Sequence, residues 1–264
     1  MKRIDSPKNE TIKKLAKLKD RRHRDKEGLF LIEGVREVKR AKESGTKLEH
    51  LYYAPKLLKG DAQTLVDRLN YLPKTELSNE AFGKLSMRQK PDGLIALAPI
   101  VEKSLEELEL PHNALVLVID GLEKPGNIGA LLRTADGANL DAVFVTGGGT
   151  DLFNPNVIRS SVGSVFSRPI VNADDAVLTE FLNQEGFRLV ATMPDASKAY
   201  WETNLRGKVA LLLGREHDGL SEAWQKAATD KVSIPMYGLA DSLNVATAGA
   251  LFIYEALRQR AHST

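Results

Sequence analysis

Cysteine is absent from all 264 residues of the chain. This absence excludes disulfide bonds, thiolate nucleophiles and zinc sites with cysteine ligands. The histidines are scattered without the paired spacing of a metal site, so no metal is predicted; they are His23, His50, His112, His217 and His262. A chain without cysteine is also consistent with a cytoplasmic protein.

Long apolar runs are missing too. No stretch reaches the roughly 18 apolar residues that a membrane-spanning helix needs, so no membrane partner is expected. The basic N-terminus is not followed by the apolar segment of a secretory signal. A content of 42% hydrophobic and 27% charged residues is ordinary for a globular protein. The length exceeds that of a typical single domain and favours two.

The common nucleotide-binding motifs are also absent. There is no G-x-G-x-x-G after a predicted strand and no G-x-x-x-x-G-K-[ST]. The three glycines at 147–149 lack a following helix, which favours a flexible loop over a phosphate cradle. No G-x-S-x-G nucleophile elbow is present. A nucleotide- or NAD-dependent enzyme is therefore disfavoured.

Positive charge is concentrated at the N-terminus. The whole chain carries a net charge of +2, but residues 1–26 contain eleven Lys or Arg and four Asp or Glu. Their net charge of +7 leaves −5 on the other 238 residues. A basic arm on a nearly neutral body is typical of polyanion binding. A solvated terminal helix explains the same residues equally well.

The hydrophobic pattern predicts two α/β domains, 1–100 and 113–264, joined by a linker at 101–112. In the first, helices are predicted at 9–20, 35–44 and 57–69, and strands at 29–32, 48–53 and 95–98. The linker is acidic and shows no core pattern. In the second, strands are predicted at 115–119, 142–145, 189–192, 210–213 and 232–234. Their continuous apolar runs, separated by helical patterns, favour a mainly parallel sheet covered by helices.

Polar residues follow three of the strands in the second half. Asn127 suits a helix N-cap, and Arg133 lies six residues further on, a third of a turn short of the same direction. Glu216 stands in a glycine-flanked loop, where glycine permits close backbone approach. Because open α/β sheets bind ligands at the carboxyl ends of their strands, these side chains could border one cleft. A capped surface helix and an ordinary strand-to-helix turn would have the same composition.

The last helix is predicted to run to about Arg260, after a polar loop. Residues 246–250 are nearly all small, which is costly in a helix. A tight crossing within the chain, a contact between two helices of a dimer, and ordinary core packing each explain them.

In their order and spacing, these blocks resemble the SpoU (TrmH-type) branch of the SPOUT methyltransferases. The motifs are N-x-x-x-x-x-R at 127–133, R-x-S-x-G at 159–163, L-G-x-E-x-x-G-L at 213–220, and I-P-M-x-G followed by S-L-N-V-A at 234–246. The first half is similar to the substrate-binding domain of these enzymes through residues 6–9, 17–22, 30–34 and Arg36. That domain resembles ribosomal-protein RNA-binding modules.

The resemblance implies a trefoil-knotted, mainly parallel C-terminal α/β domain and a smaller N-terminal α/β RNA-binding domain. It implies a homodimer through the knot region and methyl transfer from S-adenosylmethionine to a ribose 2′-hydroxyl of structured RNA. The separate N-terminal domain favours ribosomal RNA. A transfer RNA methyltransferase and a non-catalytic RNA-binding protein on the same scaffold are the alternatives, and the intact motifs disfavour the second.

Residues that match the family's functional set become specific predictions. The predicted catalytic residues are Asn127, Arg133, Glu216, Ser242 and Asn244. The predicted cofactor-binding residues are Thr192, Gly214, Ile234, Met236, Leu243 and Asn244. The predicted RNA-binding residues are Lys17, Lys19, Arg21, Arg22, Arg24, Arg36 and Arg159. Because a guanidinium group is effectively never deprotonated in a protein, Arg133 is interpreted as a phosphate clamp and not as a base.

Overall fold

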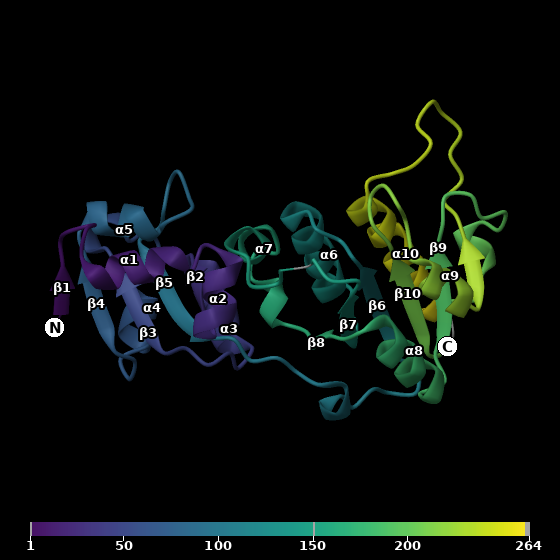
Figure 1. The fold of residues 1–264 in the computed structure, drawn as a ribbon, viewed down its shortest axis with the longest axis horizontal. Helices are drawn as coiled ribbons and strands as arrows, with labels where there is room; N and C mark the ends of the chain where they lie inside the picture. Colours follow the sequence, from purple (N-terminus) through teal and green to yellow (C-terminus); the bar gives the residue numbers. More distant parts are fainter. Residues whose placement is uncertain (1, 150, 262–264) are drawn as a thin grey trace. The chain divides into compact units, whose positions relative to one another are not determined.

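The computed structural model describes residues 2–149 and 151–261; His262 lies outside this part of the chain. The chain divides into two compact α/β units (Figure 1). Unit 1 comprises residues 1–101 together with 151–167, and unit 2 comprises 102–150 together with 168–264. A segment of the second half of the sequence therefore belongs to the first unit.

Unit 1 is built on a five-stranded mixed sheet in the order β1-β4-β3-β5-β2. Strand β4 is parallel to β1 and β3, whereas β5 is antiparallel to β2 and β3. The strands are β1 (Lys2–Ile4), β2 (Leu29–Glu33), β3 (His50–Tyr53), β4 (Lys74–Leu77) and β5 (Leu94–Pro99). The helices are α1 (Glu10–Lys17), α2 (Arg21–Glu27), α3 (Val35–Glu43), α4 (Ala62–Arg68), α5 (Asn79–Leu85) and α7 (Pro155–Ser160).

The predicted elements of unit 1 are confirmed except in one helix. Asn9 caps α1 by accepting a hydrogen bond from the amide of Thr11, and Ile12 and Leu15 are buried as their spacing predicts. The helix predicted at 57–69 begins only at Ala62, because a 3₁₀ turn and a left-handed glycine at Gly60 come before it. The pattern gave no sign of β1, α2, β4, α5 or α7.

Unit 2 is built on a six-stranded sheet in the order β11-β9-β10-β6-β7-β8. All neighbouring strands are parallel, which confirms the predicted mainly parallel sheet. The strands are β6 (Leu115–Asp120), β7 (Ala142–Thr146), β8 (Ile170–Asn172), β9 (Arg188–Thr192), β10 (Val209–Leu213) and β11 (Asp230–Val232). The helices are α6 (Pro125–Gly137), α8 (Asp175–Gln184), α9 (Glu222–Ala227) and α10 (Val245–Ala261).

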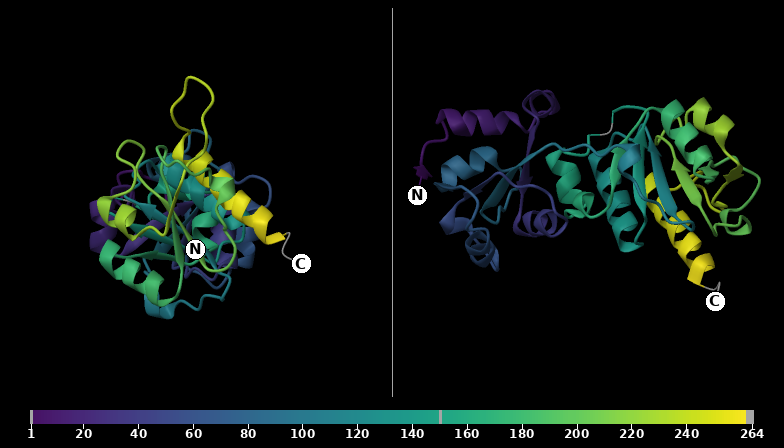
Figure 2. Two further views of the ribbon diagram at one scale, coloured as in Figure 1. Left: turned by 90° about the vertical axis from the view of Figure 1, so that its right-hand side faces the viewer. Right: turned by 90° about the horizontal axis from the view of Figure 1, so that it is seen from below.

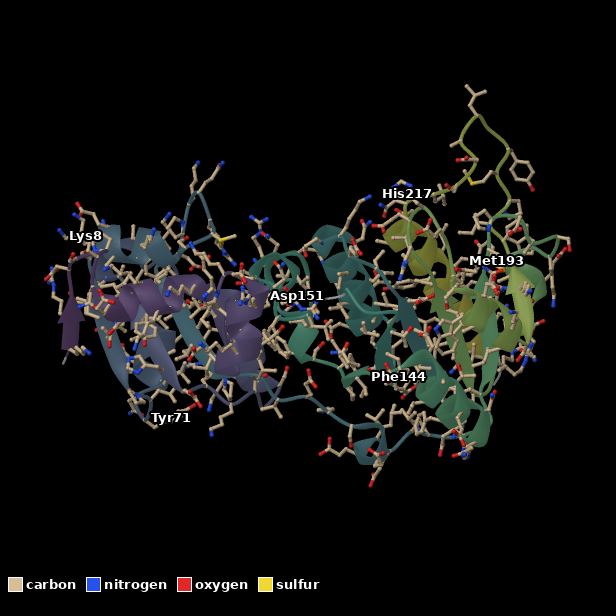
Figure 3. All side chains as sticks on the ribbon, in the orientation of Figure 1. Lys8, Tyr71, Phe144, Asp151, Met193 and His217 are labelled. Carbon is tan, nitrogen blue, oxygen red and sulfur yellow. The ribbon has the colours of Figure 1, made fainter. Side chains whose placement is uncertain are left out.

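Two helix layers cover this sheet. Helices α8 and α9 supply Leu178 and Trp224 to a core that includes Phe144 of β7 (Figure 3). The predicted linker joins the same core through Leu105, so the expectation that it has no core pattern is wrong. Its leucines at 105, 108 and 110 all pack there. Within the described residues, no helix is long and apolar enough to cross a membrane.

Helices α6 and α10 pack against each other, and Gly249 of α10 lies at this contact. A Cβ atom on Gly249 would lie 2.4 Å from Leu131 Cδ2 of α6 and 2.7 Å from Leu213 Cδ1 of β10. A side chain at position 249 would therefore displace these two leucine side chains. For this residue the structure shows a close contact within the chain and not one between two helices of a dimer.

An ion pair and a contact between aromatic rings attach residues 151–167 to the rest of unit 1. Arg24 is only 1% exposed; it donates hydrogen bonds to the carbonyls of Leu18 and Lys19, each 2.8 Å long, and pairs with the carboxylate of Asp151. The ring of Phe153 lies 4.6 Å from that of Phe30 in β2, between centroids. These contacts explain why a distant segment joins this unit.

Asp151→Ala is expected to lower the free energy of unfolding by about 3 kcal/mol, because it leaves the guanidinium of Arg24 buried without a counter-charge. Urea unfolding followed by circular dichroism measures the change. The double variant Arg24→Met with Asp151→Ala is expected to lose less, since no charge is then left uncompensated. Arg21→Ala, at an exposed position of the same helix, is the control. A loss for Asp151→Ala no larger than this control would contradict the explanation.

Candidate active site

Three of the predicted catalytic residues are joined directly by hydrogen bonds. Asn127 Nδ2 donates to Glu216 Oε1 at 2.8 Å, and Asn244 Nδ2 donates to Asn127 Oδ1 at 3.1 Å. The ammonium of Lys124 lies 3.8 Å from the carboxylate of Glu216. Because Asn127 lies on α6, Glu216 follows β10 and Asn244 precedes α10, this network ties three separate segments together.

The prediction that Asn127 is a helix N-cap is wrong. Helix α6 begins at Pro125, with Lys124 in the N-cap position and no side-chain capping bond. Proline is favoured at the first helical position, because its missing amide hydrogen has no partner to lose there. Asn127 is thus inside the helix, and both ends of its amide are free to bind other segments. Asn244 acts as a cap instead: its Oδ1 accepts from the amide of Ala246 at 3.0 Å, at the start of α10.

The loop that carries Glu216 is closed tightly on itself. A Cβ atom on Gly214 would lie 2.1 Å from the carbonyl carbon of Gly219, so only glycine fits at this position. The backbone groups of Arg215 and Gly219 also bond to each other, at 2.9 and 3.2 Å. In this closed loop the Glu216 side chain is partly buried, with 17% of its surface exposed.

A buried carboxylate that the sequence reasoning missed anchors the end of this loop. Asp120, the last residue of β6, is 1% exposed, and its Oδ2 accepts from the amide of Ser221 at 2.7 Å. The sequence contained a signal: an acidic residue ends the otherwise apolar run at 115–119. Asp120 is therefore a positioning residue for the segment that carries Glu216.

The other two predicted catalytic residues, Arg133 and Ser242, face solvent. Arg133 lies on α6, about 9 Å further along the helix axis than Asn127, and has no hydrogen bond or ion pair to any described residue. The hydroxyl of Ser242 lies 3.5 Å from a carboxylate oxygen of Asp241, at the limit of a hydrogen bond. Neither side chain is engaged by the network. Both are open to a ligand.

The predicted cofactor-binding residues lie at the ends of β9 and β10 and in the loop before α10. Thr192 Oγ1 donates to the carbonyl of Leu212 at 2.9 Å, which ties the ends of the two strands together. Residues 234–243 form no backbone–backbone hydrogen bond with any described residue, and the loop projects from the body of unit 2 (Figure 2). Ile234 and Met236 are half-buried, and Leu243 is exposed.

This loop fits a ligand that contains a flat nitrogen heterocycle. Backbone amides and carbonyls need hydrogen-bond partners, and those of residues 234–243 have none among the described residues. They can bond to the edge of such a ring while apolar side chains cover its faces. The adenine of S-adenosylmethionine has this chemistry. No group of three or more potential metal ligands occurs in the described part of the chain.

The predicted RNA-binding residues differ in accessibility. Five are exposed: Lys17, Arg21, Arg22, Arg36 and Arg159. Arg24 does not fit the prediction, because its buried guanidinium is occupied by two carbonyls and a carboxylate. Lys19 is half-buried; it donates to the carbonyls of Lys84 and Ser86 at 2.9 Å near the end of α5, and burial lowers the pKa of its ammonium group.

Gly214→Ala is expected to reduce S-adenosylmethionine binding by at least about tenfold, because the new Cβ would collide with the backbone of Gly219 and displace the loop. Isothermal titration calorimetry measures the affinity. Gly126→Ala is the matched control: a Cβ there meets nothing within 4 Å, and Gly126 lies next to Asn127. Equal affinities of the two variants would show that the close packing of the loop does not shape the cofactor site.

Comparison with known proteins agrees with this geometry. The model of the SpoU rRNA Methylase family matches residues 114–254, and that of the MRM3-like substrate binding domain matches residues 9–96. The chain is 32% identical to the 23S rRNA (guanosine(2553)-2′-O)-methyltransferase RlmP of Bacillus subtilis (strain 168), over 96% of this chain and 98% of that protein.

Solved structures match along nearly the whole chain. An RNA 2′-O ribose methyltransferase is 48% identical, with a TM-score of 0.87 over 98% of this chain and 99% of its own. The AdoMet-bound rRNA methyltransferase from Sinorhizobium meliloti is 27% identical, with a TM-score of 0.89 over 97% of each chain. With one family model matching more than half of its residues, the chain belongs to the SpoU rRNA methylase family.

Proposed function

We propose that this protein transfers a methyl group from S-adenosylmethionine to a ribose 2′-hydroxyl of ribosomal RNA. The observation that carries the proposal is the hydrogen-bonded network of Asn127, Glu216 and Asn244 beside a loop with unpaired backbone groups. The substrate is supported by the relative RlmP, whose name specifies 23S rRNA and which matches both units. A ribosomal RNA substrate also favours a cytoplasmic location.

The chain's own residues would hold the cofactor through their main chain. S-adenosylmethionine supplies a methyl group bound to a positively charged sulfur. The free amides and carbonyls of residues 234–243 would bond to the adenine edge, with Ile234, Met236 and Leu243 against its faces. Gly214 keeps the neighbouring loop compact, and Thr192 holds the ends of β9 and β10 together.

The reaction joins ribose O2′ to the methyl carbon, breaks the bond between that carbon and sulfur, and releases the hydroxyl proton to water. Its main requirement is an in-line arrangement of the three atoms. Arg133 meets this requirement as a clamp: its exposed, unpaired and permanently protonated guanidinium can form two parallel hydrogen bonds to the phosphate beside the target ribose. Its charge also stabilises the negative charge that develops on O2′. The exposed hydroxyl of Ser242 would help to order the loop and the substrate.

The test measures labelled methyl transfer to ribosomal RNA from cells that lack the protein, followed by mapping of 2′-O-methyl sites. The wild-type protein is expected to methylate a defined ribose. Arg133→Lys is expected to reduce kcat by about 100-fold with S-adenosylmethionine affinity within about twofold, because lysine keeps the charge but not the planar fork.

Arg206→Lys is the matched control, since this exposed arginine precedes β10 and lies at the opposite end of the strand from the site. It is expected to retain the wild-type kcat. Near-normal turnover of Arg133→Lys would rule out the forked clamp. A wild-type protein that transfers no methyl group to any ribosomal RNA would rule out the proposed function.

We infer in addition that the protein is a homodimer through the knot region. Tyr237 is 91% exposed and Leu239 fully exposed on the projecting loop, and Leu251 and Tyr254 form an exposed apolar pair on α10. Exposed apolar side chains gathered on neighbouring segments are typical of an interface with another protein. The trefoil knot is part of this proposal, and the tight packing at Gly249 supports it, because crossing segments of a chain need small residues.

Sedimentation velocity is expected to give about 58 kDa, twice the 29.0 kDa of one chain. Leu251→Asp with Tyr254→Asp is expected to yield a monomer, because two carboxylates would be desolvated in the interface. Val177→Asp, at an exposed apolar position of α8, is the control and should leave the dimer intact. A wild-type monomer that methylates RNA would contradict the dimer.

A further inference from the structure

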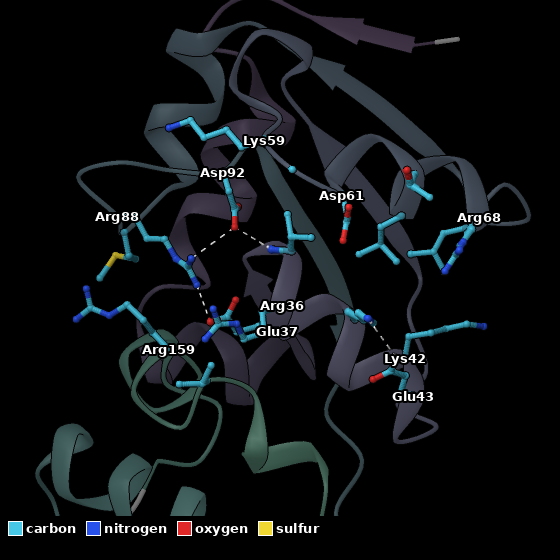
Figure 4. Close-up of a pocket in the computed structure, with 18 of the residues that line it drawn as sticks. Arg36, Glu37, Lys42, Glu43, Lys59, Asp61, Arg68, Arg88, Asp92 and Arg159 are labelled. Atoms are coloured by element: carbon cyan, nitrogen blue, oxygen red, sulfur yellow. Dashed lines mark hydrogen bonds and ion pairs between the residues drawn. The ribbon is translucent and has the colours of Figure 1, made fainter.

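Unit 1 contains a large cavity with strongly basic walls, about 1420 Å³ in volume (Figure 4). Residues of α3, α4, the 86–92 loop and the α7 region line it. Seven Lys or Arg and four Asp or Glu are among these residues. We call this feature the basic cavity. Five of its seven cations were not among the predicted RNA-binding residues.

Two of the four acidic residues, Glu37 and Asp92, form ion pairs with the same arginine, Arg88. Arg88 Nη2 lies 2.8 Å from Glu37 Oε1, and its Nη1 lies 3.6 Å from Asp92 Oδ2. Asp92 also accepts a hydrogen bond from the amide of Val35, at the start of α3. Figure 4 shows this cluster between Arg88, Glu37 and Asp92. These three residues together carry a net charge of −1. The other six cations and two acidic residues carry +4, so the lining as a whole carries +3.

Five of the remaining six cations have no carboxylate partner in the described part of the chain, and one of these five, Lys42, donates to the hydroxyl of Tyr71. Arg36, Lys59 and Arg68 form no ion pair there, and Arg159 bonds only to the side-chain oxygen of Asn156, at 3.1 Å. They come from α3, the turn before α4, α4 itself and α7, so they surround one concave surface. Like charges gathered in a concavity attract an anion that carries charge at repeated intervals. The phosphate backbone of a nucleic acid is such an anion.

Contacts with α3 hold the α7 side of the cavity in place although its backbone is strained. Val162 has a φ of 56°, which is unfavourable for a β-branched residue. Arg40 of α3 donates to the carbonyl of Val162 at 2.9 Å and to Ser164 Oγ at 3.2 Å. A Cβ on Gly163 would lie 3.1 Å from Glu37 Cα, so the segment is in close contact with α3. This packing fixes the helix that carries Arg159.

We propose that the basic cavity binds the sugar–phosphate backbone of the RNA substrate, with Arg36, Lys59, Arg68 and Arg159 as its phosphate contacts. The inference rests on the proposed function for the identity of the RNA. Phosphate contacts fix the register and orientation of a nucleic acid without reading its sequence. Because residues 151–167 follow β7 and lead into β8, the chain that holds Arg159 continues at both ends into the methyltransferase sheet.

The test compares two full-length triple variants that lose the same charge. The cavity variant carries Arg36→Gln, Lys59→Gln and Arg68→Gln. The control carries Lys47→Gln, Lys56→Gln and Lys84→Gln, which are exposed positions of unit 1 outside the cavity. Filter binding of a 23S rRNA transcript across a range of salt concentrations measures affinity. The cavity variant is expected to bind at least about tenfold more weakly than the control, with the slope of log K against log salt reduced by about 2 to 3.

Measurement of methyl transfer distinguishes an effect on RNA binding from an effect on the chemical step. The cavity variant is expected to show a raised KM for RNA, with kcat and S-adenosylmethionine affinity close to those of the control. Equal RNA binding by the two triple variants would overturn the proposal. If the wild-type protein binds the transcript but transfers no methyl group, the proposed function fails, while the binding comparison still decides the role of the cavity.

A variant with a single substitution provides a second test in case the triple cavity variant does not fold. If circular dichroism shows that the cavity variant is unfolded, Arg159→Gln is compared with Lys56→Gln in the same assay. Arg159→Gln is expected to weaken RNA binding by about threefold and to lower the salt slope by about 1. Binding equal to that of Lys56→Gln would overturn the proposal.

Discussion

The candidate active site depends on one side-chain amide. Asn127 uses both of its ends, donating to Glu216 and accepting from Asn244, so a single residue fixes the positions of three segments. Hydrogen bonds to a carboxylate are stronger than those between neutral groups, and partial burial of Glu216 strengthens this one. The close packing of Gly214 and the anchor at Asp120 serve the same end, because they hold the loop that presents Glu216.

Around this rigid centre, the groups assigned to the ligands are unsatisfied. The guanidinium of Arg133 and the backbone of residues 234–243 have no partners among the described residues. Polar groups of this kind are satisfied by water or by a ligand. The site therefore combines a fixed scaffold with open binding groups, which suits a reaction whose main demand is positioning.

In unit 1, arginine residues have two different roles, and the two groups differ in how deeply their side chains are buried. Arg24 is buried and Arg88 is partly buried, and both bind carbonyls and carboxylates of the protein and hold the fold together. Arg36 and Arg159 are of the same residue type but remain exposed at the basic cavity. A guanidinium that is buried and paired inside the protein cannot contact phosphate, so exposure distinguishes an RNA ligand from a structural residue.

The sequence by itself determined five of the six strands of the parallel sheet, all but β8, and the presence of α1 and α10, because apolar runs and helical periodicity report directly which residues are buried. The ordered motifs identified the family. Only the tertiary structure decided that Asn127 is not a cap and that Arg24 is buried. It also decided that 151–167 belongs to unit 1. Local pattern describes a residue's own helix or strand, whereas these roles depend on partners that lie 89, 117 and 127 positions away along the chain.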